Sequence, residues 1–247
     1  MRRALVVVAG AVLLACAIVA LAPAGLLDRL VASRTDGRLR LADASGLWWR
    51  GRGVVTASTT GARLPIAWRV RVLALAGGRL VVDFVPAQPG MPSGVLAIAD
   101  DDVETRALEL TLPAQLLPAF APALAPVAPE GAIEVRSASF AWRPLQSQGR
   151  IDVAWHDAQL ALAGFPISLG DVRGAASGTA EGIGGTFDNR GGDLGVRGTW
   201  SMRGDQIEGL TTLAASAATP PALRAVLPML GQPDARGDVR IEWRGRR

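Results

Sequence analysis

Apolar and polar residues alternate with a period of two along much of the chain after residue 37. The clearest runs are residues 38–41, 66–72, 108–112, 151–156 and 239–243. A period of two places the apolar side chains of a strand on one face and leaves the other face to water. The pattern therefore predicts a mainly β protein, built on an elongated, twisted antiparallel sheet that is covered on one side. Glycines cluster at residues 173–198, where we expect hairpin turns and bulges.

Three segments share one order: a short helical turn rich in Leu, Ala and Pro, a glycine, and an alternating strand that ends in tryptophan. They span residues 26–49, 112–142 and 220–243, with Gly37, Gly131 and Gly237 at the centre. We expect short apolar helices that join segments of the sheet. Either an internal repeat or the common helix–glycine–strand order explains the recurrence. A repeat would divide the β-rich domain, residues 26–247, into two related halves, 26–111 and 112–247.

The N-terminal segment, residues 1–25, is predicted to be a membrane anchor. Two arginines precede 19 uncharged residues, Ala4 to Ala22, and as a helix these would span about the ~30 Å of a hydrocarbon core. Proline follows one candidate cleavage site, Ala20 to Ala22, and lies inside the other, Ala22 to Ala24, which favours an uncleaved transmembrane helix over a signal peptide. A lipoprotein signal at Cys16 is a third interpretation, although the apolar run continues past it. Because a large domain follows a short basic N-terminus, we expect a single-pass bacterial inner-membrane protein with its body in the periplasm.

The charge composition argues against a nucleic-acid partner. All 26 basic residues are arginine, and the formal net charge is only +4, too little to indicate a phosphate-binding surface. Residues 1–90 contain 12 arginines and 4 aspartates, whereas residues 91–247 contain 14 arginines and 18 acidic residues. The basic part therefore follows the predicted anchor, where anionic lipid would attract it. Arginine-rich codon usage is the other explanation.

Two adjacent tryptophans, Trp48 and Trp49, stand in the stretch SGLWWRGRGVV at residues 45–55. Strand alternation would place Trp49 with Leu47 on the buried face and Trp48 with Arg50 on the other. We therefore interpret Trp49 as a core residue. We expect Trp48, together with Arg50 and Arg52, to contact a partner protein or the lipid headgroups.

The densest acidic cluster consists of Asp100, Asp101 and Asp102, between two alternating runs. Closely spaced carboxylates can bind calcium, but this cluster lacks the spaced acids and the glycine of an EF-hand loop. A charged hairpin turn is the favoured interpretation, and the turn is also a candidate docking point for a partner.

The sequence contains no recognisable catalytic motif. His156 is the only histidine and is followed by Asp157, but there is no G-x-S-x-G nucleophile elbow. Adjacent strand residues point to opposite faces, so a solvated histidine is favoured over a catalytic base. The single cysteine lies in the apolar N-terminal run. We accordingly predict no catalytic, cofactor-binding or metal-binding residue, and a protein that is not an enzyme.

Framework motifs extend over nearly the whole chain. They comprise G-x-x-W-x-G at Gly46, Trp49 and Gly51, then LPIAWRVRVLALAGGRL, LPAQLLPAFAP, GDLGVRGTWSMRG and ALRAVLPMLGQPDARGDVRIEW. With the N-terminal anchor, they resemble the general secretion pathway protein N family of bacterial type II secretion systems. The resemblance implies an accessory protein whose periplasmic body contacts other inner-membrane secretion components and the outer-membrane secretin. It supplies no enzymatic residue.

Two other functions remain open from the residues alone. If the one-sided sheet curls, its apolar face would form a groove for lipid or another hydrophobic cargo. An unrecognised hydrolase would depend on His156. Both alternatives are compatible with membrane lipid at the N-terminus and with the absence of a nucleic-acid partner.

Overall fold

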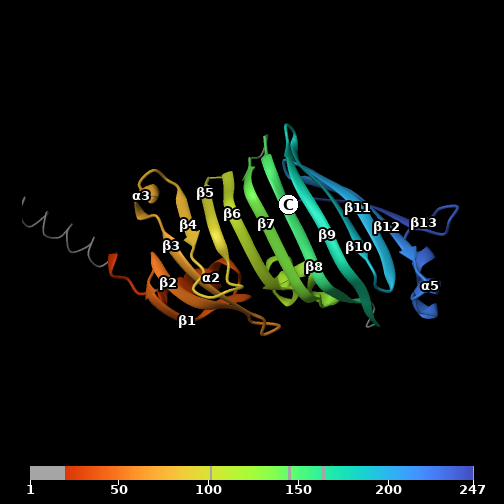
Figure 1. Ribbon diagram of the computed structural model, residues 1–247, viewed down its shortest axis with the longest axis horizontal. Coiled ribbons are helices and arrows are strands. Elements are labelled where there is room, and N and C mark those ends of the chain that lie inside the picture. Colours follow the sequence, from red (N-terminus) through yellow and green to blue (C-terminus); the bar gives the residue numbers. More distant parts are fainter. Residues whose placement is uncertain (1–19, 101, 144–145, 163–164, 247) are drawn as a thin grey trace, which may run out of the picture.

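The computed structural model describes residues 20–100, 102–143, 146–162 and 165–246 (Figure 1). Most of the predicted anchor, residues 1–19, and Asp101 lie outside the described residues. Among the described residues, none of the helices has both the length and the apolar character needed to cross a bilayer.

Within the described residues, fourteen strands form one antiparallel sheet in the order β1 to β12, then β14 and β13. Their bounds are β1 Leu39–Leu47, β2 Arg50–Ala57, β3 Arg63–Val70, β4 Leu80–Phe84, β5 Ser93–Ala99, β6 Asp102–Pro113, β7 Glu130–Trp142, β8 Gln148–Leu162, β9 Phe165–Thr179, β10 Gly182–Arg190, β11 Leu194–Arg203, β12 Gln206–Ala215, β13 Gln232–Pro233 and β14 Val239–Arg246. Figure 1 shows an elongated, twisted sheet with β1 to β4 at one end and β12 to β14 at the other. The predicted mainly β fold is confirmed.

The alternation predicted from the sequence gives the sheet two different faces. Directly opposed residues of antiparallel strands share a face, and the register aligns Ile133, Trp155 and Val172 across β7, β8 and β9. We call this apolar side the inner face. The neighbouring row, which includes Ala154 and Arg173, belongs to the charged outer face. One predicted strand ends early, because Val72 begins a short helix, α3 Val72–Leu75, instead of continuing β3.

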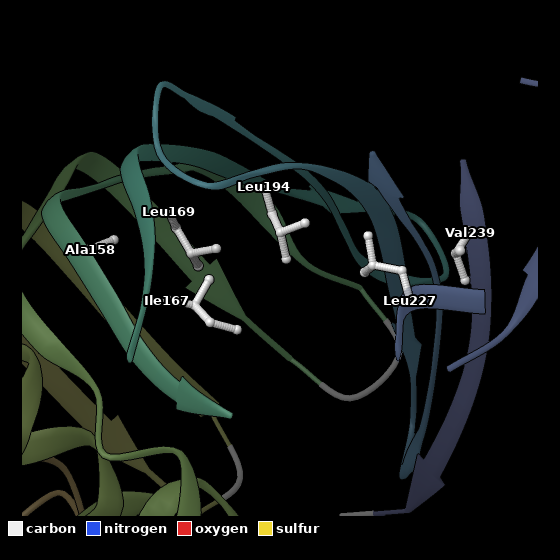
Figure 2. Packing of buried hydrophobic residues seen from close by; sticks show 6 residues of the cluster. All are labelled: Ala158, Ile167, Leu169, Leu194, Leu227 and Val239. Carbon is white, nitrogen blue, oxygen red and sulfur yellow. The ribbon is translucent and has the colours of Figure 1, made fainter. Parts of the chain in front are cut away.

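Short helices cover parts of the inner face, as the three recurring segments predict. They are α2 Leu26–Arg34, η1 Ala114–Leu116, α4 Leu117–Phe120, η2 Pro122–Val127, α5 Pro221–Val226 and η3 Leu227–Met229. The remaining described helix, α3, belongs to none of these segments and has no buried residue. Leu116 of η1 is 1% exposed and packs with Leu39 and Ala57 of β1 and β2. At the other end, Figure 2 shows Leu227 of η3 on the same side of the strands as Leu169 and Leu194. These contacts place three hydrophobic clusters along one continuous sheet.

Many glycines lie inside strands, contrary to the expectation that the glycine-rich stretch would consist mainly of turns. Gly185 of β10 pairs with Trp200 of β11, and a Cβ at residue 185 would lie 2.6 Å from Trp200 Cε2. The pairs Gly51 with Trp68, Gly198 with Phe187 and Gly209 with Trp243 have the same arrangement. The missing side chain thus makes room for an aromatic ring on the adjacent strand. Turn glycines are present as well, with positive φ angles at Gly191 and Gly192.

Candidate partner and membrane contact sites

Trp48 and Trp49 form the two-residue turn between β1 and β2, because Leu47 pairs with Arg50. The prediction that strand alternation separates the two rings onto opposite faces is therefore wrong. Both rings are half-buried, and both pack against the cluster of Ala24, Leu41, Trp68 and Val70. They can do so because the chain just before α2 folds back over the turn and supplies apolar surface to both.

This contact, which we call the junction, fixes residues 20–24 against the turn. The indole Nε1 of Trp49 donates to the carbonyl of Ala20 at 2.9 Å, and the backbone N–H of Trp48 donates to Ala22 at 3.1 Å. Ala24 is 1% exposed and donates its N–H to Gly46 at 3.0 Å. The tryptophan pair therefore determines where the predicted membrane segment meets the sheet.

Beside the junction, the outer face has a shallow basic groove of about 510 Å³. Arg50 and Arg52 of β2 lie along it, and Arg69 of β3 is directly opposite Arg50. The nearest acidic residue, Asp83, is already bound to Arg71 at 2.7 Å, and that hydrogen bond lowers the pKa of Asp83. Among the residues that the structure describes, none of the three groove arginines takes part in an ion pair within 4.0 Å. The groove consequently presents net positive charge, as an anion-binding surface requires, although Asp83 lies directly opposite Arg69 and offsets part of its charge.

Arg69 was not among the residues selected from the sequence. The alternation of apolar and polar residues at 66–72 is the sequence feature that could identify Arg69, because it places this residue on the polar face of the strand. Its proximity to Arg50 depends on the pairing of β2 with β3, and a single sequence does not reveal that register.

The acidic cluster lies at the β5 to β6 hairpin turn, where Ala99 pairs with Asp102. Asp100 adopts a φ angle of +48°, as a tight turn permits for aspartate, and Asp101 lies outside the described residues. Asp102 contacts Arg143 at 3.2 Å. The neighbouring Glu104 contacts Arg79 and Arg143. Within the described chain, no group of three or more metal-ligating side chains is present.

The arginine groove and the acidic turn are separate surfaces. Strands β3 and β4 lie between β2 and β5, so the structure does not bring Arg50 or Arg52 next to Asp100 or Asp102. A partner that contacted both would have to extend across the outer face of four strands.

His156 lies on the outer face, as predicted. Its Nε2 is 3.7 Å from Glu134 and its Nδ1 is 3.4 Å from Asp171. Asp157 follows with a φ angle of +50° at a bulge in β8. No hydrogen bond in the described part of the chain joins His156 to a hydroxyl group, so the geometry there provides no Ser-His-Asp triad.

A second charged hollow, of about 350 Å³, lies on the outer face over β7 to β10. Its charged lining consists of Glu134, Arg136, Arg150, Asp152, Arg173 and Asp188. Arg150 binds Asp152 at 2.8 Å, and Arg136 binds Glu134. These pairs neutralise one another, in contrast to the basic groove at the junction.

The fold and these surfaces define a one-sided β-sheet protein that presents charged contact surfaces. The family model described as type II secretion system protein N matches residues 37–242. The chain therefore belongs to the type II secretion system protein N family, which confirms the resemblance found in the motifs. Neither a curated protein nor a solved structure matches the chain significantly. The family implies an accessory role in type II secretion and is not known as a family of enzymes.

Proposed function

We propose that this chain is an inner-membrane-anchored accessory subunit of the type II secretion machinery, with residues 26–247 in the periplasm. The observation that carries the proposal is the family match, which covers nearly the whole described sheet. In this function the sheet binds other inner-membrane secretion components and the secretin, and transforms no substrate.

The junction supports the membrane side of the proposal. It fixes Ala20, the first described residue and part of the apolar run, beside Trp49 and close to the basic groove. A bilayer that held the N-terminal segment would therefore have Arg50, Arg52 and Arg69 near its anionic headgroups. The headgroups would supply negative charge to Arg50 and Arg52, which form no ion pair within the described residues.

Protein partners would then bind farther along the outer face, where charged residues alternate. Ion pairs in the exposed hollow over β7 to β10 contribute little to stability, so exchanging them for contacts with a partner costs little. Complementary charges on such a surface determine which partner binds and in which position, and they contribute less to the affinity.

A second candidate function is the binding of lipid or another hydrophobic cargo on the inner face. The observation that favours it is a row of half-buried aromatic residues there, including Phe187, Trp200 and Trp243. Aromatic rings on a curved sheet can line a groove for acyl chains.

One crosslinking experiment separates the two functions. A photo-crosslinking amino acid replaces either Thr186, which is exposed on the outer face, or its neighbour Phe187, which faces inward. In cells that assemble the secretion system, the accessory function predicts adducts with secretion proteins from position 186. Cargo binding predicts lipid adducts from position 187. Adducts only with unrelated envelope proteins at position 186 would refute the accessory function.

Membrane placement is tested separately with a crosslinker at Arg52 and with protease added to spheroplasts. The proposal predicts phospholipid adducts at Arg52 and digestion of residues 26–247 by external protease. A control crosslinker at Arg190, which is exposed far along the sheet, should give no phospholipid adduct. Protection of the domain from protease would contradict a periplasmic location.

A further inference from the structure

The connection between β3 and β4 carries apolar side chains that face water. Residues 72–78, which we call the apolar tip, contain no charged or polar side chain and include the short helix α3. Leu73 is 92% exposed, the highest value for any large apolar side chain in the described part of the chain, and Val72 and Leu75 are exposed as well. Single exposed leucines are ordinary on a protein surface, whereas a contiguous apolar patch marks a contact with a membrane or another molecule.

Backbone hydrogen bonds give the apolar tip a defined shape. At its base, the N–H of Arg71 donates to the carbonyl oxygen of Val81 at 2.9 Å. At its end, the N–H of Arg79 donates to the carbonyl oxygen of Ala74 at 3.0 Å, and Gly78 closes the turn with a φ angle of +72°. Since α3 itself buries no residue, this local structure presents the apolar side chains outward and does not pack them against the sheet.

The apolar tip lies beside the junction. The N–H of Val70 donates to the carbonyl oxygen of Trp49 at 2.6 Å, and the indole of Trp49 binds Ala20. Only Arg71 separates Val70 from α3. Figure 1 shows α3 at the same end of the sheet as the first described residues. The 19 residues that precede Ala20 include most of the apolar run, so a bilayer that holds them comes close to the apolar tip.

Arginines flank the apolar tip on both sides. Arg71 precedes it and binds Asp83 at 2.7 Å, whereas Arg79 follows it and binds Glu104 at 2.5 Å. Both arginine side chains remain about half exposed despite these ion pairs. Their guanidinium groups can therefore also donate to lipid phosphates, while their apolar stems lie along the acyl chains. An apolar centre with basic margins is typical of segments that lie in a membrane interface.

We propose that the apolar tip inserts into the leaflet from which the N-terminal segment emerges, with Leu73 among the acyl chains and with Arg71 and Arg79 at the phosphates. This inference rests on the proposed function, which places the N-terminal segment in the bilayer. The position beside the apolar run and the basic margins favour lipid over a protein surface. Two attachments, at the junction and at the apolar tip, fix the direction in which the sheet leaves the membrane, because a single attachment leaves it free to tilt.

The test measures the lipid exposure of residue 73 in the full-length chain, reconstituted in nanodiscs of phosphatidylethanolamine and phosphatidylglycerol. Cys16→Ala removes the native thiol, and Leu73→Cys carries an NBD fluorophore. Met229→Cys is the matched control, because Met229 is 82% exposed on η3, at the other end of the sheet. Insertion by about 5–10 Å predicts quenching by a nitroxide-labelled phospholipid at position 73, and iodide quenching about threefold or more weaker there than at position 229.

A second pair of variants tests whether the leucine itself holds the apolar tip in the bilayer. The fluorophore is placed at Ala76→Cys, an exposed position of the tip, with and without Leu73→Asp. A carboxylate is costly to move among acyl chains, so Leu73→Asp should raise iodide quenching at position 76 to about the value at position 229. Unchanged quenching at position 76 would overturn the proposal, because the tip would then lie near the membrane without inserting.

Two further outcomes would also overturn it. The first is equal iodide quenching at positions 73 and 229. The second is protection from iodide without quenching by the nitroxide lipid, which would assign the apolar tip to a protein surface, either a partner's or that of a second copy.

A fluorophore on the native Cys16, within the apolar run, separates this inference from the proposed function. Membrane anchoring predicts that a phospholipid with a nitroxide in its acyl chain quenches the fluorophore at Cys16. Quenching at Cys16 without lipid quenching at position 73 would refute the insertion of the apolar tip alone. Absence of quenching at Cys16 would refute the anchoring itself.

Discussion

Gly51 lies beneath the indole ring of Trp68 on the adjacent strand, and replacing it with alanine tests whether this contact fixes the junction. A Cβ at residue 51 would lie 2.7 Å from Trp68 Cζ2, 2.8 Å from the carbonyl oxygen of Ser45 and 3.1 Å from that of Leu47. Two of these atoms belong to the backbone of β1. Trp68 is only 6% exposed, and its Nε1 donates to the carbonyl of Trp48 at 2.9 Å. Neither neighbour can therefore move without breaking another contact.

The expected loss of unfolding free energy is about 1–3 kcal/mol, the range for inserting a methyl group into a packed site. Displacing the ring would add about 1 kcal/mol for the hydrogen bond to Trp48. The reduced backbone entropy of the unfolded chain offsets roughly 0.5–1 kcal/mol of this. A net destabilisation of about 1–3 kcal/mol remains.

Urea unfolding of the full-length chain in detergent, followed by circular dichroism, measures this difference. Gly25→Ala is the matched control, because a Cβ there meets no atom within 4 Å and residue 25 already has a helical φ of −59°. We expect the control to change the unfolding free energy by less than about 0.5 kcal/mol. Equal stability of Gly51→Ala and the native chain would refute the interpretation that Gly51 makes room for the ring.

Two further predictions concern polar contacts. Hydrogen bonds from Arg40 and from the N–H of Leu41 lower the pKa of Asp28 from 3.8 to about 2. This contribution is present above pH 3.8 and is lost as the pH falls toward 2, so Asp28→Asn should cost about 1–2 kcal/mol at pH 7 and flatten the acid limb of the stability profile. An unchanged acid limb would contradict that assignment. Asn189 bridges three strands: its Nδ2 donates to Leu169 and Leu194, and its Oδ1 accepts from Val196. Asn189→Ala leaves these backbone groups unpaired and should cost about 2–4 kcal/mol in urea unfolding, whereas a loss below about 0.5 kcal/mol would show that water replaces the side chain.

Sequence periodicity predicted the strands and the short helices because both depend on local pattern. The alternation at residues 151–156 became β8, and the apolar segments near residues 26, 112 and 220 became helical turns. The same reasoning failed at Trp48 and Trp49. A two-residue turn is ordinarily signalled by Asn-Gly or Asp-Gly, and the tryptophan pair lacks that signal. Its position depends on residues 20–24 packing over the turn, which is a tertiary contact.

The sequence predicted only part of the candidate site, and the remainder was missed for a similar reason. Arg50 and Arg52 were identified from their position beside the tryptophans, but Arg69 joins them only through the β2 to β3 register. Asp102 was identified from its acidic neighbours, whereas its partner Arg143 lies 41 residues away. Side chains brought together across strands depend on long-range pairing, and local periodicity contains no information about it.

The coverage of β1 has a consequence for stoichiometry. A sheet with two accessible edges can add copies at both sides and grow without limit. Here the junction, α2 and the bulge in β1 block one side, so any further strand that the described sheet accepts must pair along β14. Open-ended growth, in which copies of the sheet add at both edges as in a fibre, is thereby prevented.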